Sequence, residues 1–352
     1  MLASAAGTLA ETTSTHPNKA EIMSSFHSPL TRCIATVFPV LAAASPMIGC
    51  SDSDGGDAGD NAAPIPVFLS QSEARTAIGR RDEFVSAMSK FDLQSRTGSL
   101  QPVTVDQYLS ALPDHVIALS AADKESVTGE LNTVLDRMTA AGLRVPADPS
   151  EVQFVRTDGK EEGDAVAYTR SDTIFLCDGF FASPPELQVH VIAHELFHIW
   201  SRANPELVRW PTHEALGFVR VPGASFPTSL ADRKVTNPDD PVVNETIRVT
   251  FQGVPTQVFL GLIASADYHG GTLFDYLLLQ LVEPASGALH ELDSAEGLAE
   301  QIGTTTTNVL SAEEISAEHF AIGVLQDAEV HDPALIQAVL KPFAAGATAN
   351  HD

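Results

Sequence analysis

The chain has 352 residues, of which 44% are hydrophobic, so it is long enough to form one large or two small domains around a sizeable core. It carries 46 acidic against 20 basic residues, and its formal net charge is −26. This charge argues against a nucleic acid or an anionic membrane surface as a binding partner, because both are themselves negatively charged.

The first 49 residues are interpreted as a targeting segment, with Met23 as a candidate for the true start. Residues 33–44 form an apolar run that is too short to span a bilayer as a stable helix. Residues 47–50 (Met-Ile-Gly-Cys) resemble the lipobox of bacterial lipoproteins, in which a signal peptidase cleaves before the cysteine and that cysteine is acylated. The resemblance implies a lipid on Cys50 and an exported protein anchored to a membrane of the bacterial cell envelope. An ordinary cleaved signal, and hence secretion, is the alternative.

Residues 50–66 are predicted to be a flexible acidic tether, because they are rich in Asp, Gly, Ala and Ser and show no apolar periodicity. The folded domain is expected over residues 67–348. Of the three cysteines, Cys33 would leave with the signal and Cys50 would carry the lipid. Cys177 is then left without a partner for an intramolecular disulfide.

Helices are expected at the start of this domain. Residues 70–73 form a Ser-x-x-Glu capping box that opens a helix predicted to reach about residue 91. A second helix is predicted over residues 104–112, and an amphipathic one over residues 120–141, ended by Gly142. Three short segments rich in Val, Phe, Tyr and Ile follow and are predicted to be strands: residues 151–156, 165–169 and 172–177.

A long helix is predicted next, capped by Ser183, with Pro184 at its first position and Glu186 three residues after the cap. It is expected to end at Asn204-Pro205. The remaining predicted elements are helices over residues 208–218, 311–325 and 333–343, and strands over residues 244–250, 256–263 and 272–282, the first two paired around Gly253. This order of elements predicts a single α+β domain with a mixed or antiparallel sheet, an active-site helix, and helices at both ends.

The run His194-Glu195-Leu196-Phe197-His198 lies within the long helix. Because residues four apart share one face of a helix, the two histidines can present ring nitrogens to one metal ion. Glu195 is one step round the helix, close enough to hold a water at the metal. This is the zinc hydrolase arrangement of two ligands and a general base. The alternative is a pair of core histidines with local hydrogen bonds.

A catalytic zinc site needs a third protein ligand. Glu314 is one candidate, because Glu318 lies on the same helical face and could accept a hydrogen bond from the second ring nitrogen of His194. His190 is too far along the helix for the same ion and is expected to be a surface or supporting residue. The other candidates for the third ligand are His213, its neighbour Glu214, and Asp275.

Together these motifs resemble those of the gluzincin metallopeptidases, in which a distant glutamate completes the site and an acidic residue four positions later supports the first histidine. Four strings also resemble an uncharacterised group of bacterial proteins with a zincin-type site: residues 193–198, 201–205, 236–239 and 313–320. The resemblance spans about residues 169–325. It implies a zincin-like fold, zinc bound by His194, His198 and Glu314, and peptidase activity. It also implies that the strand at residues 172–177 is the sheet edge that pairs with an extended substrate.

The predicted function is that of an envelope-tethered zinc metallohydrolase, in particular a peptidase acting on a peptide or protein substrate. Glu195 would take a proton from a zinc-activated water and pass it to the leaving amine. Tyr268 and His269, which precede two glycines, are candidates for stabilising the oxyanion. The alternative is a binding or structural lipoprotein with a vestigial or structural zinc site. Residues 67–145 are candidates for a segment that covers the cleft.

Overall fold

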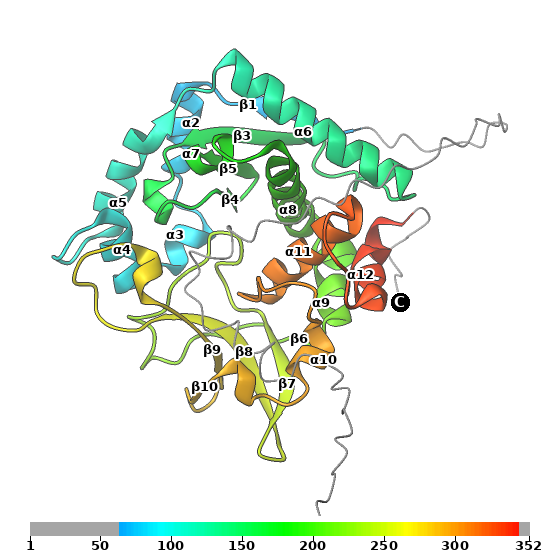
Figure 1. Ribbon diagram of the computed structural model, residues 1–352. Coiled ribbons are helices and arrows are strands. Elements are labelled where there is room, and N and C mark those ends of the chain that lie inside the picture. Colours follow the sequence, from blue (N-terminus) through cyan, green and yellow to red (C-terminus); the bar gives the residue numbers. More distant parts are fainter. Residues whose placement is uncertain (1–62, 345–352) are drawn as a thin grey trace, which may run out of the picture.

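The computed structural model describes residues 63–344 as a mixed α+β structure, which confirms the predicted class. The expected signal segment and Cys50 lie outside the described residues. Figure 1 shows one sheet and the long helix α8 (Pro185–Ala203) toward one end of the molecule and a second sheet at the other end, with α11 (Ala312–Leu325) between them. Within residues 63–344, no helix is both long and apolar enough to cross a membrane.

The first sheet is mixed. Its strands in the described region are β1 (Ile65–Phe68), β2 (Val116–Ile117), β3 (Glu151–Thr157), β4 (Ala167–Arg170) and β5 (Thr173–Cys177). Their order is β1-β3-β5-β4, with β2 paired to β3. The chain runs along the edge as β4, turns at Ser171, where φ is 55°, and continues as β5 between β4 and β3. The expectation that residues 172–177 form an edge strand is therefore wrong, because β4 is the edge strand at this end of the sheet.

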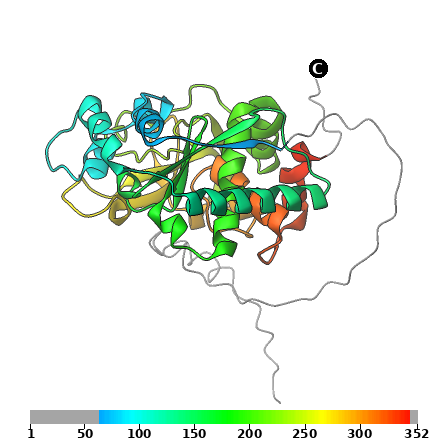
Figure 2. The same ribbon diagram turned by 90° about the horizontal axis from the view of Figure 1, so that it is seen from above.

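Alternate residues of this sheet face two different cores, as the pleat of a strand requires. Phe154 and Ile174 belong to the larger core cluster with α6 (Ala121–Ala140) and α8. Their neighbours Val155 and Phe175 belong to a second cluster built with the N-terminal helices. Figure 2 shows α6 and the N-terminal helices on different sides of the first sheet.

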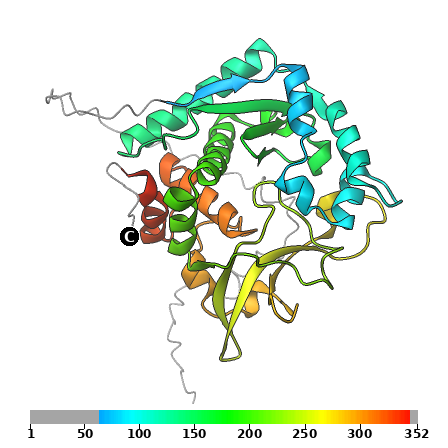
Figure 3. The ribbon, with the colours of Figure 1, turned by 180° about the vertical axis from the view of Figure 1, so that it is seen from behind.

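Four short helices cover the second face of this sheet: α2 (Gln71–Ile78), α3 (Glu83–Ala87), α4 (Lys90–Thr97) and α5 (Val105–Ala111). Figure 3 shows them, coloured blue to cyan, on the side of the molecule away from α11 and α12 (Pro333–Leu340). A single helix from residue 70 to about 91 was expected, and this is wrong. The side chains of Asp82 and Ser89 accept amide hydrogen bonds from Val85 (3.0 Å) and Asp92 (3.0 Å), so each starts a new helix.

Helix α8 carries the His-Glu-x-x-His motif and packs against α6 and α11. Trp200 on α8 meets Phe320 on α11, with ring centroids 5.9 Å apart. The helix begins after Pro184 without a side-chain cap. The predicted capping role of Ser183 is wrong, because its hydroxyl donates to the carbonyl of Gly179 (2.8 Å) in the preceding turn.

The second sheet is antiparallel throughout, in the order β10-β9-β8-β7-β6. Its strands are β6 (Phe218–Arg220), β7 (Glu245–Phe251), β8 (Val254–Ala264), β9 (Leu277–Val282) and β10 (Leu289–His290). Gln252 and Gly253 both have positive φ, 50° and 80°, which is the turn that a two-residue hairpin needs. The predicted pair of strands around Gly253 is confirmed.

Two predicted elements in this half are only partly correct. Of the expected strand over residues 272–282, the first part is a 3-10 turn, Leu273–Tyr276, opened by a Thr272–Asp275 capping box. Residues 208–218 hold the helix α9 (Trp210–Ala215) and then the start of β6. Among the described residues, the remaining α-helices are α7 (Asp178–Phe181) and α10 (Leu298–Ile302).

Candidate metal centre

The structure brings His194, His198 and Glu314 together. The two histidines lie one turn apart on α8, with ring centroids 4.8 Å apart, and Glu314 faces them from the first turn of α11. His194 Nε2 is 3.2 Å from one oxygen of Glu314, and His198 Nε2 is 3.9 Å from the other. One ligand atom from each of the three residues lies within 4.8 Å of the other two. In this geometry, the three side chains could coordinate one small cation together.

Glu314 is held from both sides. Asn237 Nδ2 donates to Oε1 (2.7 Å) and Asn308 Nδ2 donates to Oε2 (3.0 Å), while the hydroxyl of Ser311 accepts from the Glu314 amide (3.3 Å) and caps the helix. Burial raises the pKa of Glu314, but the hydrogen bond with His194 and the charges of His198 and His194 outweigh it and hold the pKa at about 2. The carboxyl group is therefore ionised, which is the form that binds a metal.

Each histidine uses its other nitrogen to contact a carboxylate. His194 Nδ1 donates to Glu318 (3.2 Å), the contact predicted from the sequence. Glu318 in turn accepts from His190 Nε2 (3.2 Å), and His190 Nδ1 meets Asp327 (2.9 Å). His190 thus supports Glu318 from behind.

Glu313 plays the same part for His198, a role that the sequence did not predict. Its carboxylate accepts from His198 Nδ1 (3.2 Å), from Ser201 Oγ (2.8 Å) and from His213 Nε2 (3.0 Å). Charge and hydrogen bonds from Arg209, His198 and His213 overcome burial and lower the pKa of Glu313 well below its ordinary value. The available signal was a pair of adjacent glutamates in the first turn of a helix that is mostly buried.

The residues present fit a zinc ion. With Nδ1 of each ring bonded to a carboxylate, Nε2 is the nitrogen available as a ligand. Among the residues that the structure describes, the buried Nε2 of His198 has no hydrogen-bond partner. A buried polar atom without a partner is costly, and a cation between the two rings and Glu314 would satisfy it. Two imidazoles and one carboxylate are donors that suit zinc.

Glu195 lies beside this group and is only 4% exposed. The hydroxyl of Thr169, on the edge strand β4, donates to its Oε2 (2.7 Å). Burial raises the pKa of Glu195, and the neighbouring histidines oppose that shift without cancelling it. A carboxylate with a raised pKa next to a metal centre is placed to exchange a proton.

Asp239 is a further carboxylate at this centre, beside Glu314 and Glu195. It lies in the string 236–239, to which the sequence assigned no particular role. Its Oδ1 accepts from the backbone amide of Thr169 (2.6 Å). Ligand atoms of Asp239, Glu195 and His198 lie within 4.8 Å of one another. Burial and the charges of Glu195 and Glu314 raise the pKa of Asp239 well above its ordinary value.

Tyr268 and His269 are not brought to the centre. The Tyr268 hydroxyl donates to the carbonyl of Gly271 (2.9 Å), and His269 Nδ1 meets the carbonyl of Asp267 (3.0 Å), so both bond within their own loop. No hydrogen bond or ion pair found within residues 63–344 joins either of them to the histidines of α8. The geometry gives no support to their role as oxyanion donors.

The other candidates for the third ligand make different contacts or lie on the surface. His213 is bonded to Glu313, and Glu214 is exposed on the surface of α9. Asp275 accepts from the amide of Thr272 (2.8 Å) in its 3-10 turn. Glu314 is therefore the candidate that the fold favours.

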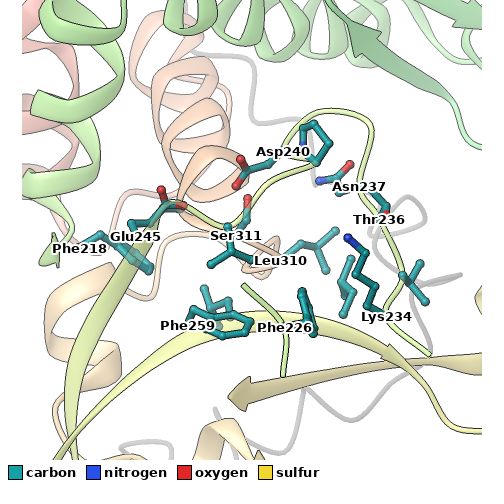
Figure 4. A pocket seen from close by; sticks show the side chains of 16 residues that line it. Phe218, Phe226, Lys234, Thr236, Asn237, Asp240, Glu245, Phe259, Leu310 and Ser311 are labelled. Atoms are coloured by element: carbon teal, nitrogen blue, oxygen red, sulfur yellow. The ribbon is translucent and has the colours of Figure 1, made fainter. Parts of the chain in front are cut away.

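A small cavity lies next to the centre, under the loop that carries Asn237 and Asp240 (Figure 4). Ser311 lines one side, and Phe226 and Phe259 lie across from the loop. Its volume is about 40 Å³, which is room for roughly three water molecules.

A scan of protein-family models, a search of curated proteins and a search of solved structures each found no match to this chain. The centre is therefore interpreted from its own geometry, as a buried cluster of two histidines and a glutamate with a second glutamate beside it.

Proposed function

We propose that the protein is a zinc-dependent metallohydrolase with a zincin-like, gluzincin-type active site, and that it acts as a peptidase. The observation that carries this proposal is the convergence of His194, His198 and Glu314 within 4.8 Å, with the Glu195 carboxylate next to them. The lipobox-like string ending in Cys50 supports a location at the bacterial cell envelope, anchored by a lipid.

His194 and His198 would hold the zinc through Nε2 and Glu314 through its carboxylate. When bound, the zinc would supply Lewis-acid chemistry, by polarising the scissile carbonyl and lowering the pKa of a water molecule. Glu195 accepts a proton from the attacking water and passes it to the leaving amine. Thr169 orients Glu195 by donating a hydrogen bond to it.

The first sheet offers a surface for an extended substrate. Because β4 is its edge strand, a peptide could add to the sheet as a further strand. The amide of Thr169 now donates to Asp239, so pairing at that residue requires the loop that carries Asp239 to move. Substrate binding is therefore coupled to displacement of this loop.

A second candidate function is a metal-binding protein without turnover, and Asp239 is the observation that favours it. A structural zinc site closes all four positions with protein ligands, whereas a catalytic site leaves one open. Asp239 is buried beside Glu195 and His198 and could supply the extra ligand. His213 and Asp275, which the sequence offered as alternative metal ligands, are engaged elsewhere.

The test is a paired measurement of zinc content and peptide hydrolysis on the full-length protein, before and after chelation. Hydrolysis of a peptide library would be followed by mass spectrometry. The hydrolase predicts activity that is lost on chelation and lost in Glu195→Gln, while that variant keeps its zinc. Retained zinc with no cleaved peptide in the wild type would favour the binding protein. A wild type that binds no zinc would contradict both.

A further inference from the structure

A second cluster of metal-ligating side chains lies on the other side of the first sheet, with the N-terminal helices. It consists of His115, at the end of the turn after α5, and of Asp158 and Glu161, in the loop after β3. We propose that these three residues form a second divalent-cation site, which takes a transition metal such as zinc or manganese and ties the N-terminal helices to the sheet. This site is separate from the proposed hydrolase centre and does not depend on its activity.

The three ligand atoms already lie at near-coordinating separations. His115 Nδ1 is 2.9 Å from Asp158 Oδ1 and 3.9 Å from Glu161 Oε2, and all three atoms lie within 4.8 Å of one another. Ligands about 2.0–2.2 Å from a zinc ion are themselves roughly 3–3.5 Å apart. Only small side-chain shifts would be needed to admit the ion.

The backbone holds the cluster in this arrangement. The Asp158 amide donates to the carbonyl of His115 (3.0 Å), which continues the pairing of β2 with β3. The Lys160 amide donates to Asp158 Oδ1 (3.0 Å) and fixes that carboxylate. Gly159, with φ of 79°, starts the 3-10 turn that carries Glu161, and a Cβ there would lie 3.0 Å from the carbonyl oxygen of Ala165.

The side chain of Glu161 provides a second, independent observation that points to a cation at this site. Its side chain is 2% exposed, and its Oε1 accepts from the hydroxyl of Tyr168 (2.8 Å). Its Oε2 is buried, faces His115, and has no hydrogen-bond partner among the described residues. Leaving a buried carboxylate oxygen without a partner is costly, and a cation would remove that cost.

An ion can reach this position from solvent. The side chains of His115 and Asp158 are 26% and 27% exposed, and His115 lines an open cavity of about 320 Å³ beside α4 and α5. Waters could complete the coordination from that side. The neighbouring Glu162 is not available as a ligand, because Arg96 binds both of its oxygens (3.0 and 2.9 Å). One imidazole with two carboxylates suits zinc or manganese better than calcium, which prefers oxygen ligands alone.

The experiment counts metal ions in the full-length protein after equilibration with a defined free zinc concentration, using elemental analysis by mass spectrometry. We expect two zinc ions per wild-type chain and one in His115→Gln and in Asp158→Asn. Zinc should also raise the melting temperature of Glu314→Gln, which keeps the second site, but not that of Glu314→Gln combined with His115→Gln. Manganese is then tested in the same way.

His290→Gln is the matched control. His290 pairs with Glu283 at 2.8 Å and is as exposed as His115, but no third ligand accompanies it within residues 63–344. The His290→Gln variant should keep both zinc ions. A single ion that is lost in Glu314→Gln and retained in His115→Gln would overturn the second site and leave the hydrolase centre intact. A single ion that is lost in His115→Gln would support the second site and contradict the first.

Discussion

Each histidine of the candidate metal centre has one ring nitrogen against a carboxylate and the other turned toward Glu314. Glu318 serves His194 and Glu313 serves His198. These contacts fix which nitrogen carries the proton and keep the rings from rotating, so that both Nε2 atoms stay pointed at one position. The two glutamates are therefore as much a part of the centre as the histidines that they hold.

Replacing Glu313 by Gln should weaken zinc binding by roughly 10- to 100-fold, because the amide is a poorer acceptor for the His198 Nδ1 proton. Competition with a chelator of known affinity measures the change. Glu283→Gln is the control, because Glu283 also contacts a histidine, His290, which is not one of the candidate zinc ligands. An unchanged affinity in Glu313→Gln would show that His198 needs no such partner.

Replacing Glu195 by Gln should lower the rate of peptide hydrolysis by roughly 10²- to 10⁴-fold, because the amide cannot accept the proton of the attacking water. The bound zinc should stay, since Glu195 is not one of the three ligands. Activity and metal content are to be measured on the same preparation. Full activity in this variant would remove Glu195 from the proposed mechanism.

The candidate ligands on α8, His194 and His198, could be predicted from the sequence because they lie one helical turn apart, where residue spacing alone sets their relative positions. Glu314 and Glu318 were found for the same reason, since they lie four residues apart on one helix. Glu313 and Asp239 could not be found in this way. Their roles depend on contacts with residues about 70 to 115 positions away in the chain, which only the packed fold creates.

At the scale of elements, α4 carries a buried ion network that ties the N-terminal helices to the rest of the fold. Arg96 is 6% exposed and contacts Asp92, Glu162 and the carbonyl of Thr236. Burial lowers the pKa of Arg96, but the two carboxylates outweigh it and raise the pKa above its ordinary value. The guanidinium group therefore stays charged in the interior.

Arg96→Met should lower the free energy of unfolding by about 3–5 kcal/mol, because it leaves two buried carboxylates without their counter-ion. The control is Arg80→Met, which breaks an exposed pair with Asp172 and should cost no more than about 1 kcal/mol. Urea unfolding followed by circular dichroism compares the two. Equal losses would contradict a structural role for the buried network.

Local residue patterns predicted the long helices and the β7–β8 hairpin. They failed for elements whose ends or positions depend on contacts with other parts of the fold. The single helix expected from residue 70 is divided because two further side chains cap new helices within it. Ser183 had the right residue type for a cap, but its hydroxyl is taken by the turn of α7. The position of β5 inside the sheet follows from strand order, which the residue pattern of one strand does not encode.

At the scale of the molecule, stability should depend on pH through His213. Burial lowers the pKa of His213, but the carboxylates of Glu245 and Glu313 beside its ring outweigh it and hold the pKa at about 9, against 6.5 for the ordinary group. The charged form is thus favoured in the folded state. The contribution of the charged His213 ring to the free energy of unfolding is complete below about pH 6.5. It is lost as the pH rises through about 9.

His213→Gln should therefore lower the free energy of unfolding most near pH 6. The difference in this free energy between the variant and the wild type should shrink by about 3 kcal/mol toward pH 10. Unfolding is to be measured with a chelator present at every pH, so that metal binding does not enter. A difference that stays constant from pH 6 to pH 10 would show that the ring is not charged in the folded protein.

The location of the whole molecule can be tested at Cys50, which lies outside the described residues. Because acylation of this cysteine would supply the anchor, Cys50→Ser should move the protein from the membrane fraction to the soluble fraction of the cell envelope. Fractionation with immunoblotting measures this. A wild type that is already soluble would favour the cleaved secretory signal.

The most direct test of the central claim is anomalous diffraction at the zinc absorption edge, recorded from crystals of the protein grown with zinc. We predict an anomalous peak about 2.0–2.2 Å from Nε2 of His194, from Nε2 of His198 and from the carboxylate of Glu314. No peak there, or Glu314 turned away from both rings, would contradict it.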